Sequence, residues 1–432
     1  MHYIDRGFHQ YHLLFKYTAI ALISVVGFSL IPFYFEQFEM TRSELELFTL
    51  FNWLFISVCL ANILPKGIWS ISFIFFTAFS IFHGGLVFVS SVDLITDKDI
   101  LYVIRVWFHL AETKQAIYLV NYTFIIYAIT VLLVSKPIKQ PSPITNLTQH
   151  KKLFSLAGYL LFAFLGIFFL IAISTGAIFS YSAYLSAVKS STVISNLFVY
   201  LYIFIGLSIV IVASTYQKGF SPLFFIGYGI WAVIAFKLGL RGEVLFPTAV
   251  ATAILARKGP PIKTYKLVVI TLILLMATVV VKNARLSGDY SEIDNLNPLN
   301  AIAEMGSSIR TIQETIKWRS EGFERLYGAS YWAPFERQIA LFLPIERPPA
   351  EKDYRLLNRV VLDKVGPIGF SPVAEAYINF GEKGTILVGI VLGLIFAILD
   401  RIPSSLTNDI FIGVSIIPLL SLIHISEPTR PY

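Results

Sequence analysis

Residues 153–174 read LFSLAGYLLFAFLGIFFLIAIS and contain no charged side chain. A helix of this length crosses the ~30 Å hydrocarbon core of a bilayer, and runs of roughly 17–25 apolar residues recur along the chain. Only helices and closed barrels satisfy their backbone polar groups in lipid. Because the runs are continuous rather than alternating, we predict an all-α polytopic membrane protein.

The composition agrees with a membrane protein and excludes an ordinary soluble domain. Hydrophobic residues make up 56% of the chain and charged residues 14%, with a mean hydropathy of +0.70. The net charge is +7, but lysine and arginine in a membrane protein mostly set its orientation, so we expect no nucleic-acid partner. The single cysteine, Cys59, excludes an internal disulfide.

Length and hydropathy predict about eleven transmembrane helices. The short run 243–257 either spans the membrane or forms a re-entrant pair with 220–240. The tail 425–432 has no helical pattern; we expect it to be non-native and the true chain to continue, which leaves room for a twelfth span. The predicted spans are 12–34, 47–64, 68–91, 115–135, 153–174, 194–216, 220–240, 243–257, 266–282, 384–400 and 410–424.

Lysine and arginine collect in alternate connections, whereas the intervening connections are acidic or mixed. The basic connections should be cytoplasmic. The N-terminus is then cytoplasmic, and the long segment 283–383 between helices nine and ten is an extracytoplasmic loop. The basic connections hold Lys66; Lys136, Lys139, Lys151 and Lys152; Lys218; and Arg257, Lys258, Lys263 and Lys266.

The segment 283–383 contains two helix starts. Asn297-Pro298 combines a capping residue with a proline at the first helical position, and apolar residues at spacings of three and four then predict an amphipathic helix through Trp318. Residues 366–381 read GPIGFSPVAEAYINFG. There Ser371 can cap a helix, and Glu375 lies in the first full turn, near the free N–H groups that favour anions.

Several ionisable residues are predicted at the outer ends of the spans. Arg241-Gly242-Glu243 follows one span, and Lys282 and Arg285 follow another. Charges near membrane depth are costly and indicate functional sites. The alternative is that their long side chains extend to the lipid headgroups.

These motifs resemble the Wzy-type O-antigen polymerases, which join lipid-linked sugar repeat units. The resemblance is carried by Arg241-Gly242-Glu243, Glu304-Met305-Gly306, Gly369-Phe370-Ser371, Glu375-Ala376-Tyr377 and Asn379-Phe380-Gly381. It implies a membrane glycosyltransferase fold of the GT-C type, related to the O-antigen ligases. It also implies transfer of a glycan from undecaprenyl diphosphate to a second undecaprenyl-diphosphate-linked unit at the outer face of the bacterial cytoplasmic membrane, with a chain-length regulator as a further partner.

The residue types fit that chemistry. A departing diphosphate needs cationic partners, which arginine supplies through paired hydrogen bonds, and the acceptor hydroxyl needs a base. We expect Glu375 to be the base, with Glu304 as the alternative, and no metal or other cofactor. The residues expected at the diphosphate or glycan are Arg241, Arg285, Arg310, Lys282, Glu243 and the helix start at Ser371.

Two other functions remain open from the sequence. Asp97-Lys98-Asp99 offers a metal-assisted alternative, as in other GT-C glycosyltransferases. A flippase or transporter predicts charges at mid-membrane and paired broken helices, whereas the charges here gather at the outer ends of the spans.

The topology is directly testable. A reporter that is active only in the cytoplasm, fused after Ser320, should be silent, because residues 283–383 are predicted outside. A second fusion after Lys152, in a predicted cytoplasmic connection, is the positive control. Activity at Ser320 with silence at Lys152 would invert the orientation.

Overall fold

The computed structural model describes residues 2–136, 147–259, 263–287, 297–340, 348–366 and 368–421. The chain divides into two compact units, and α12 (Pro298–Met305) leads from the second to the first. The helices of the first unit are α1 (His2–Tyr34), α2 (Arg42–Ile63), α3 (Ile71–Ser90), α4 (Lys98–Val103), α5 (Ala111–Val134), α13 (Ile309–Ser320), α14 (Ala329–Ile339), α15 (Leu357–Lys364), α16 (Pro372–Phe380) and α17 (Glu382–Arg401). Those of the second are α6 (Leu147–Ser174), α7 (Tyr181–Ser190), α8 (Thr192–Thr215), α9 (Leu223–Lys237), α10 (Arg241–Lys258), α11 (Thr264–Ser287) and α18 (Leu406–Ser421).

The all-α prediction is confirmed: the described ranges hold helices and turns and no β-strand. A helix lies at each of the eleven predicted spans. Seven of the described helices are long and apolar enough to cross a membrane, and α9, α18 and residues Val269–Val280 of α11 are shorter apolar helices. The helix α10 belongs to neither group, because it carries charges at both ends. Its crossing of the membrane stays a prediction. The tail 425–432 lies outside the described residues.

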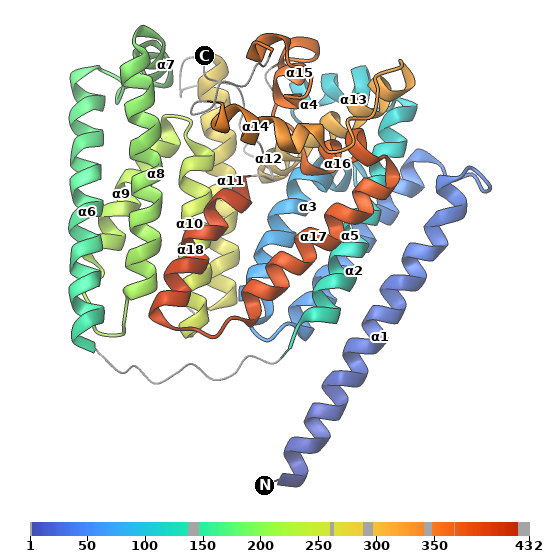
Figure 1. Cartoon of the computed structure of the whole chain (residues 1–432), viewed down its shortest axis with the longest axis horizontal. Coiled ribbons are helices and arrows are strands. Elements are labelled where there is room, and N and C mark those ends of the chain that lie inside the picture. Colours follow the sequence, from blue (N-terminus) through green and yellow to red (C-terminus); the bar gives the residue numbers. More distant parts are fainter. Residues whose placement is uncertain are drawn as a thin grey trace. The chain divides into compact units, whose positions relative to one another are not determined.

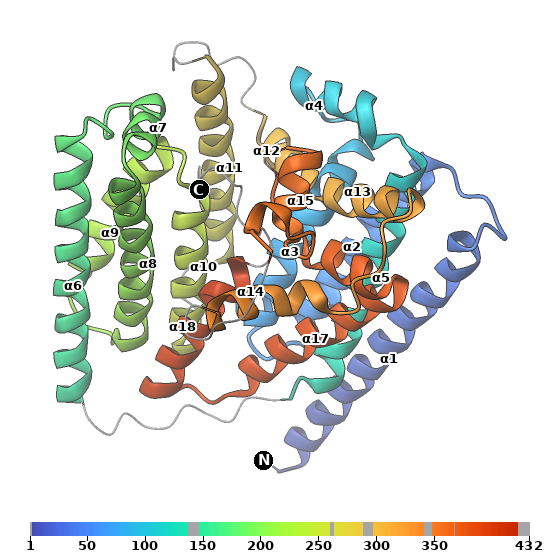
Figure 2. The ribbon, with the colours of Figure 1, turned by 45° about the horizontal axis from the view of Figure 1, so that its top comes forward.

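In the first unit, α5 is the central helix. It packs against α1, α2, α3, α13, α16 and α17. In its most apolar 18-residue stretch 72% of the residues are buried, compared with 28% for the same length of α1. The short helices α4 and α13–α16 gather at one end of this bundle, opposite the N-terminal end of α1 (Figure 1). In the turned view, α13 and α16 lie across the ends of α3 and α5 (Figure 2). The bundle therefore supports a layer of short helices at a single end.

Small residues allow α17 to approach α5 closely. Gly389 and Gly393 are four residues apart, and a Cβ added at Gly393 would lie 2.8 Å from the Cβ of Thr130 and 3.0 Å from the Tyr127 carbonyl oxygen. Helices in lipid associate through such close packing. At the other end of α17, the buried Asp400 carboxylate accepts hydrogen bonds from Ile71 N (2.7 Å) and Ser72 N (3.0 Å). It thereby caps α3 from another helix.

The amphipathic helix predicted over 297–318 is two helices rather than one. Asn297 does cap its start, because Leu299 N donates to Asn297 Oδ1 at 3.0 Å. A 3₁₀ turn at Gly306–Ser308 then separates α12 from α13. The cause is contact with α3: a Cβ at Gly306 would lie 1.9 Å from Leu86 N, and one at Gly85 would lie 2.4 Å from the Ile302 carbonyl oxygen. The two backbones touch only because both positions are glycine.

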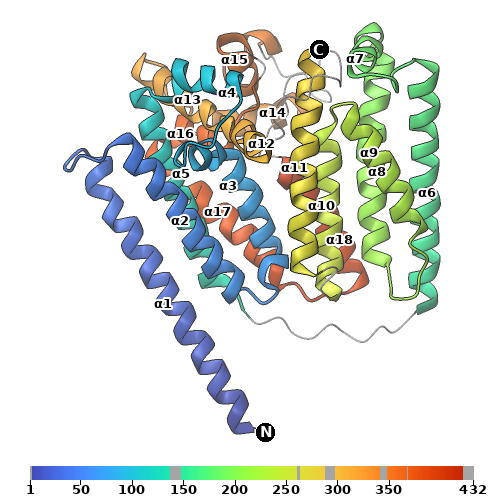
Figure 3. The same cartoon turned by 180° about the vertical axis from the view of Figure 1, so that it is seen from behind.

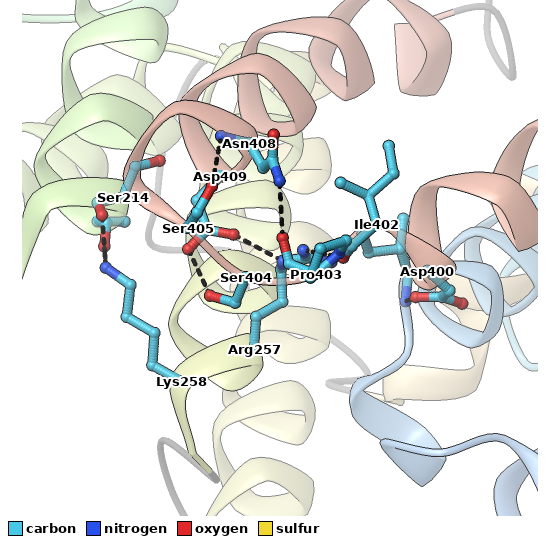
Figure 4. A network of polar contacts seen from close by, with 12 residues as sticks. Ser214, Arg257, Lys258, Asp400, Ile402, Pro403, Ser404, Ser405, Asn408 and Asp409 are labelled. Carbon is cyan, nitrogen blue, oxygen red and sulfur yellow. Dashed lines mark hydrogen bonds and ion pairs between the residues drawn. The ribbon is translucent and has the colours of Figure 1, made fainter. Parts of the chain in front are cut away.

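In the second unit, α8 lies between α6 and α10 (Figure 3), and a buried ion pair joins α10 to α18. Arg257 Nε donates to Asp409 at 2.8 Å, and one terminal nitrogen of Arg257 donates to the Ile402 carbonyl at 2.6 Å (Figure 4). Ser404 also donates to Asp409 at 2.8 Å. These contacts satisfy two charges that would be expensive to bury alone.

The contact between α12 and α3 predicts a clear loss of stability. Gly306→Ala should destabilise the protein by about 1–3 kcal/mol or more, because the added methyl group meets backbone rather than a movable side chain. The matched control is Gly166→Ala in α6, where nothing lies within 4 Å of the added Cβ and alanine favours the helix. Thermal unfolding of the purified protein measures both. Equal melting temperatures for the two variants would contradict the contact.

Candidate active site

The site is organised by α16, and its start is fixed by Ser371. The Ser371 hydroxyl oxygen accepts from Val373 N (3.1 Å) and Ala374 N (3.5 Å) and lies 2.7 Å from Nε2 of His83 in α3. The other ring nitrogen of His83 lies 2.9 Å from the Phe79 carbonyl, which can only accept. In the neutral imidazole, Nε2 therefore accepts a hydrogen bond from the Ser371 hydroxyl.

This arrangement gives Ser371 a structural role. Both Ser371 and His83 are buried, and the serine closes the helix start with its own oxygen. Its predicted part in binding an anion stays a hypothesis. The capping prediction itself is confirmed, with Pro372 at the first helical position.

Glu375 is held by side chains from two helices. Ser330, at the start of α14, donates to Glu375 Oε1 at 2.7 Å. Asn379, one turn further along α16, donates to Ser330 Oγ at 2.7 Å and to the Glu375 carbonyl at 2.7 Å. The Asn379 amide oxygen in turn accepts from Gly328 N at 2.6 Å. Because the Ser330 hydroxyl accepts from Asn379, its own proton is directed at the carboxylate.

The surroundings of Glu375 suit a general base. Burial raises the pKa of this carboxyl above its ordinary 4.5, and the hydrogen bond from Ser330 opposes only part of that rise. Burial also raises the pKa of the neighbouring Tyr331, and the charge of Glu375 adds to the effect. A carboxylate with a raised pKa accepts a proton more readily at neutral pH.

The opposite side of α16 faces two arginines, Arg319 from the last turn of α13 and Arg325 from the connection between α13 and α14. Arg325 lies against Gly381, because a Cβ there would be 2.9 Å from an Arg325 terminal nitrogen. Burial raises the pKa of Tyr377, and the charges of Arg319 and Arg325 partly oppose that rise. Leu326 N donates to the Ile378 carbonyl at 3.3 Å, which ties the connection to the helix.

A second charged cluster fixes α14 on its outer side. Arg337 donates to Asp353 at 2.8 Å, and Arg355 bonds both Asp353 (2.9 Å) and Glu336 (2.7 Å). Burial favours a raised pKa for Asp353, but the hydrogen bonds from Arg355 and Arg337 lower it to about 2. These pairs hold the helix that supplies Ser330.

Two other predicted residues belong to the same unit. Arg310 lies 3.7 Å from Glu314 on α13 and sits over the Trp107 ring at 5.7 Å. Glu304 is half-buried on α12. The structure brings Ser330 and Asn379 to Glu375, which makes Glu375 the better candidate for the base.

The remaining predicted residues lie in the second unit. Arg241 is the first residue of α10, and Glu243 is half-buried in the first turn of that helix. The side chains of Arg241, Lys282 and Arg285 lie outside the described residues, so their predicted contacts with a diphosphate stay hypotheses.

In the Asp97-Lys98-Asp99 motif of the metal-assisted alternative, Asp97 has a structural role. Asp97 caps α4, since its carboxylate accepts from Asp99 N (2.9 Å) and Ile100 N (3.2 Å). Within the described ranges, no group of three or more histidine, cysteine, aspartate or glutamate side chains could hold a metal ion.

Sequence reasoning missed His83, Ser330, Arg319 and Arg325. A histidine inside an apolar span is itself a signal, because polar groups are costly there. The others stand in segments without a recognisable pattern, and only the fold brings them to α16.

The fold and the site define a class: a polytopic helical membrane protein in which a layer of short helices holds a half-buried carboxylate. Residues 15–424 match the family "O-antigen polysaccharide polymerase Wzy", and the chain belongs to that family. It is also 25% identical over 245 residues to "Protein CapE" of Staphylococcus aureus, a match that covers 56% of this chain and 54% of the relative. The chain thus spans about half of that relative's length. No solved structure matches, so the GT-C relationship stays a prediction.

The raised pKa of Glu375 predicts a pH-dependent cost in stability. The folded state binds this proton more tightly than the unfolded state, so stability falls as pH rises from 4.5 through the raised value. Glu375→Gln should therefore raise the melting temperature at pH 7–8 and change it little near pH 4. The exposed Glu321→Gln is the control. A lower melting temperature at neutral pH would contradict the assigned shift.

Proposed function

We propose that this protein is a polysaccharide polymerase that transfers a growing glycan from undecaprenyl diphosphate onto a second lipid-linked repeat unit. Membership of the polymerase family supports the reaction class. The observation that carries the residue assignment is Glu375, whose carboxylate is oriented by Ser330 and raised in pKa by burial. The lipid carrier and the glycosyltransferase mechanism are part of the proposal.

The proposed reaction is a single displacement. A hydroxyl of the acceptor sugar gives its proton to Glu375 while its oxygen attacks the anomeric carbon of the donor sugar. The bond between that carbon and the diphosphate oxygen breaks, and its electron pair leaves with the diphosphate. One base and one attack predict inversion at the anomeric carbon.

Ser330 and Asn379 keep the base in position for this step. Asn379 donates one hydrogen bond to Ser330 and another to the Glu375 backbone carbonyl, and the Ser330 hydroxyl fixes one carboxylate oxygen. The second oxygen, Oε2, is then the one available to the acceptor hydroxyl. Pre-oriented groups of this kind lower the entropic part of the barrier.

Charge and the fold both support a reaction at the outer face of the membrane. The basic connections predict a cytoplasmic N-terminus, and α13–α16 lie at the opposite end of the first unit from that terminus (Figure 1). We therefore place the reaction at the outer face of the cytoplasmic membrane. A chain-length regulator remains a proposed partner.

The function is tested by deleting the gene and separating the surface glycan by electrophoresis. Loss of the polymer ladder, with the single-unit product retained, is expected. Complementation with Glu375→Gln should reduce polymerisation by about 10²–10⁴-fold, because the amide cannot take the proton. Complementation with Glu321→Gln should restore the ladder, since Glu321 is exposed and pairs only at 3.9 Å with Lys317.

Both variants must accumulate in the membrane to the level of the unaltered protein. A full ladder from Glu375→Gln would remove Glu375 as the base. An unchanged ladder in the deletion strain would remove the polymerase function itself.

A further inference from the structure

A pocket of about 380 Å³ opens beside α16 and is lined by Arg319, Glu324, Arg325 and Tyr327. The pocket is open to solvent, and its lining is more polar than apolar. Two guanidinium groups face one carboxylate, so the lining carries a net positive charge. The Tyr327 ring is 76% exposed and open to a ligand.

The connection that forms the pocket is held in an unusual backbone conformation. Tyr327 has φ of 48°, in the left-handed region that bulky residues rarely adopt, and Gly328 follows with φ of 94°. Two hydrogen bonds to α16 fix this stretch, from Leu326 N to the Ile378 carbonyl and from Gly328 N to the Asn379 side chain. Such strain persists where the surrounding structure enforces it, and it clusters at functional sites.

The pocket is coupled to the proposed base through a continuous set of contacts. Gly328 bonds Asn379, which bonds Ser330, which bonds Glu375. Arg325, from the connection between α13 and α14, lies against Gly381, the residue that ends α16.

We propose that Arg325 and Arg319 bind the diphosphate of the lipid-linked donor. This inference rests on the proposed polymerase function and assigns the leaving group to residues that the motifs alone did not indicate. Arg325 is the main contact, because one Arg319 nitrogen already donates to the Phe323 carbonyl. Gly381 has φ of 67°, in the left-handed region that favours glycine, and the Arg325 guanidinium lies beside it.

Arg325 would act on the leaving group. As the bond to the anomeric carbon breaks, the electron pair moves onto the diphosphate oxygen, and the paired N–H groups of Arg325 stabilise the added negative charge through hydrogen bonds.

The test measures binding to the purified full-length protein in detergent, with geranylgeranyl diphosphate as the probe. Arg325→Gln should weaken binding about 10- to 150-fold, the loss expected for a hydrogen bond to a charged group. Arg325→Lys should recover only part of it, because lysine lacks the planar fork. Lys317→Gln is the matched control, since Lys317 is an exposed cation of the same helix region and should bind as the unaltered protein does.

Glucuronic acid serves as the second probe, because an acidic sugar of the glycan presents a related anionic group. Weakened diphosphate binding with unchanged glucuronic acid binding supports the proposal. If Arg325→Gln lost only glucuronic acid binding, the pocket would be assigned to the glycan, and the proposed binding of diphosphate by Arg325 would be overturned. Equal diphosphate binding by Arg325→Gln and Lys317→Gln, in variants with unchanged melting temperatures, would also overturn it.

Failure of this inference differs from failure of the proposed function. In the complementation assay, a full polymer ladder from Arg325→Gln would overturn the pocket assignment and leave the polymerase function intact. A missing ladder from Arg325→Gln, with a normal ladder from Lys317→Gln, supports both. Deletion without loss of the ladder would overturn the function whatever the probes show.

Discussion

The hydrogen bond between Ser371 and His83 is the contact on which the arrangement of the site depends. A single hydroxyl caps the start of α16 and donates a hydrogen bond to a histidine inside a membrane helix. A short helix of nine residues has little stability alone, so its position must come from such tertiary contacts. This attachment to α3, together with packing against α5, α13 and α17, locates α16 and with it Glu375.

The helical repeat then divides α16 into two working faces. Glu375 and Asn379 are four residues apart and meet the start of α14, whereas Tyr377 and Gly381 form a second face toward Arg325. Residues at this spacing share one side of a helix. The predicted base thus lies on α16 itself, whereas the arginines come from α13 and from the connection that follows it. Two backbone hydrogen bonds, from Leu326 and Gly328, tie that connection to α16.

The site also has a cost in stability. A buried carboxylate with a raised pKa and a tyrosine in the left-handed region both oppose folding. The cost is offset by ordinary structural contacts nearby, such as the close approach of Gly306 to α3 and the ion pairs of Asp353. A division of this kind, with strain at the site and firm packing around it, is expected of a protein whose chemistry needs pre-oriented groups.

The sequence by itself determined the helices and their caps. Apolar length predicts a span, and Asn297 or Ser371 predicts a helix start, because these signals act within one helical turn. It also indicated Glu375, through a motif of adjacent residues. Only the tertiary structure decided which groups meet it: Ser330 lies 45 residues from Glu375, and His83 lies 288 residues from Ser371. The break at Gly306 was missed for the same reason, since the backbone that interrupts the helix belongs to α3.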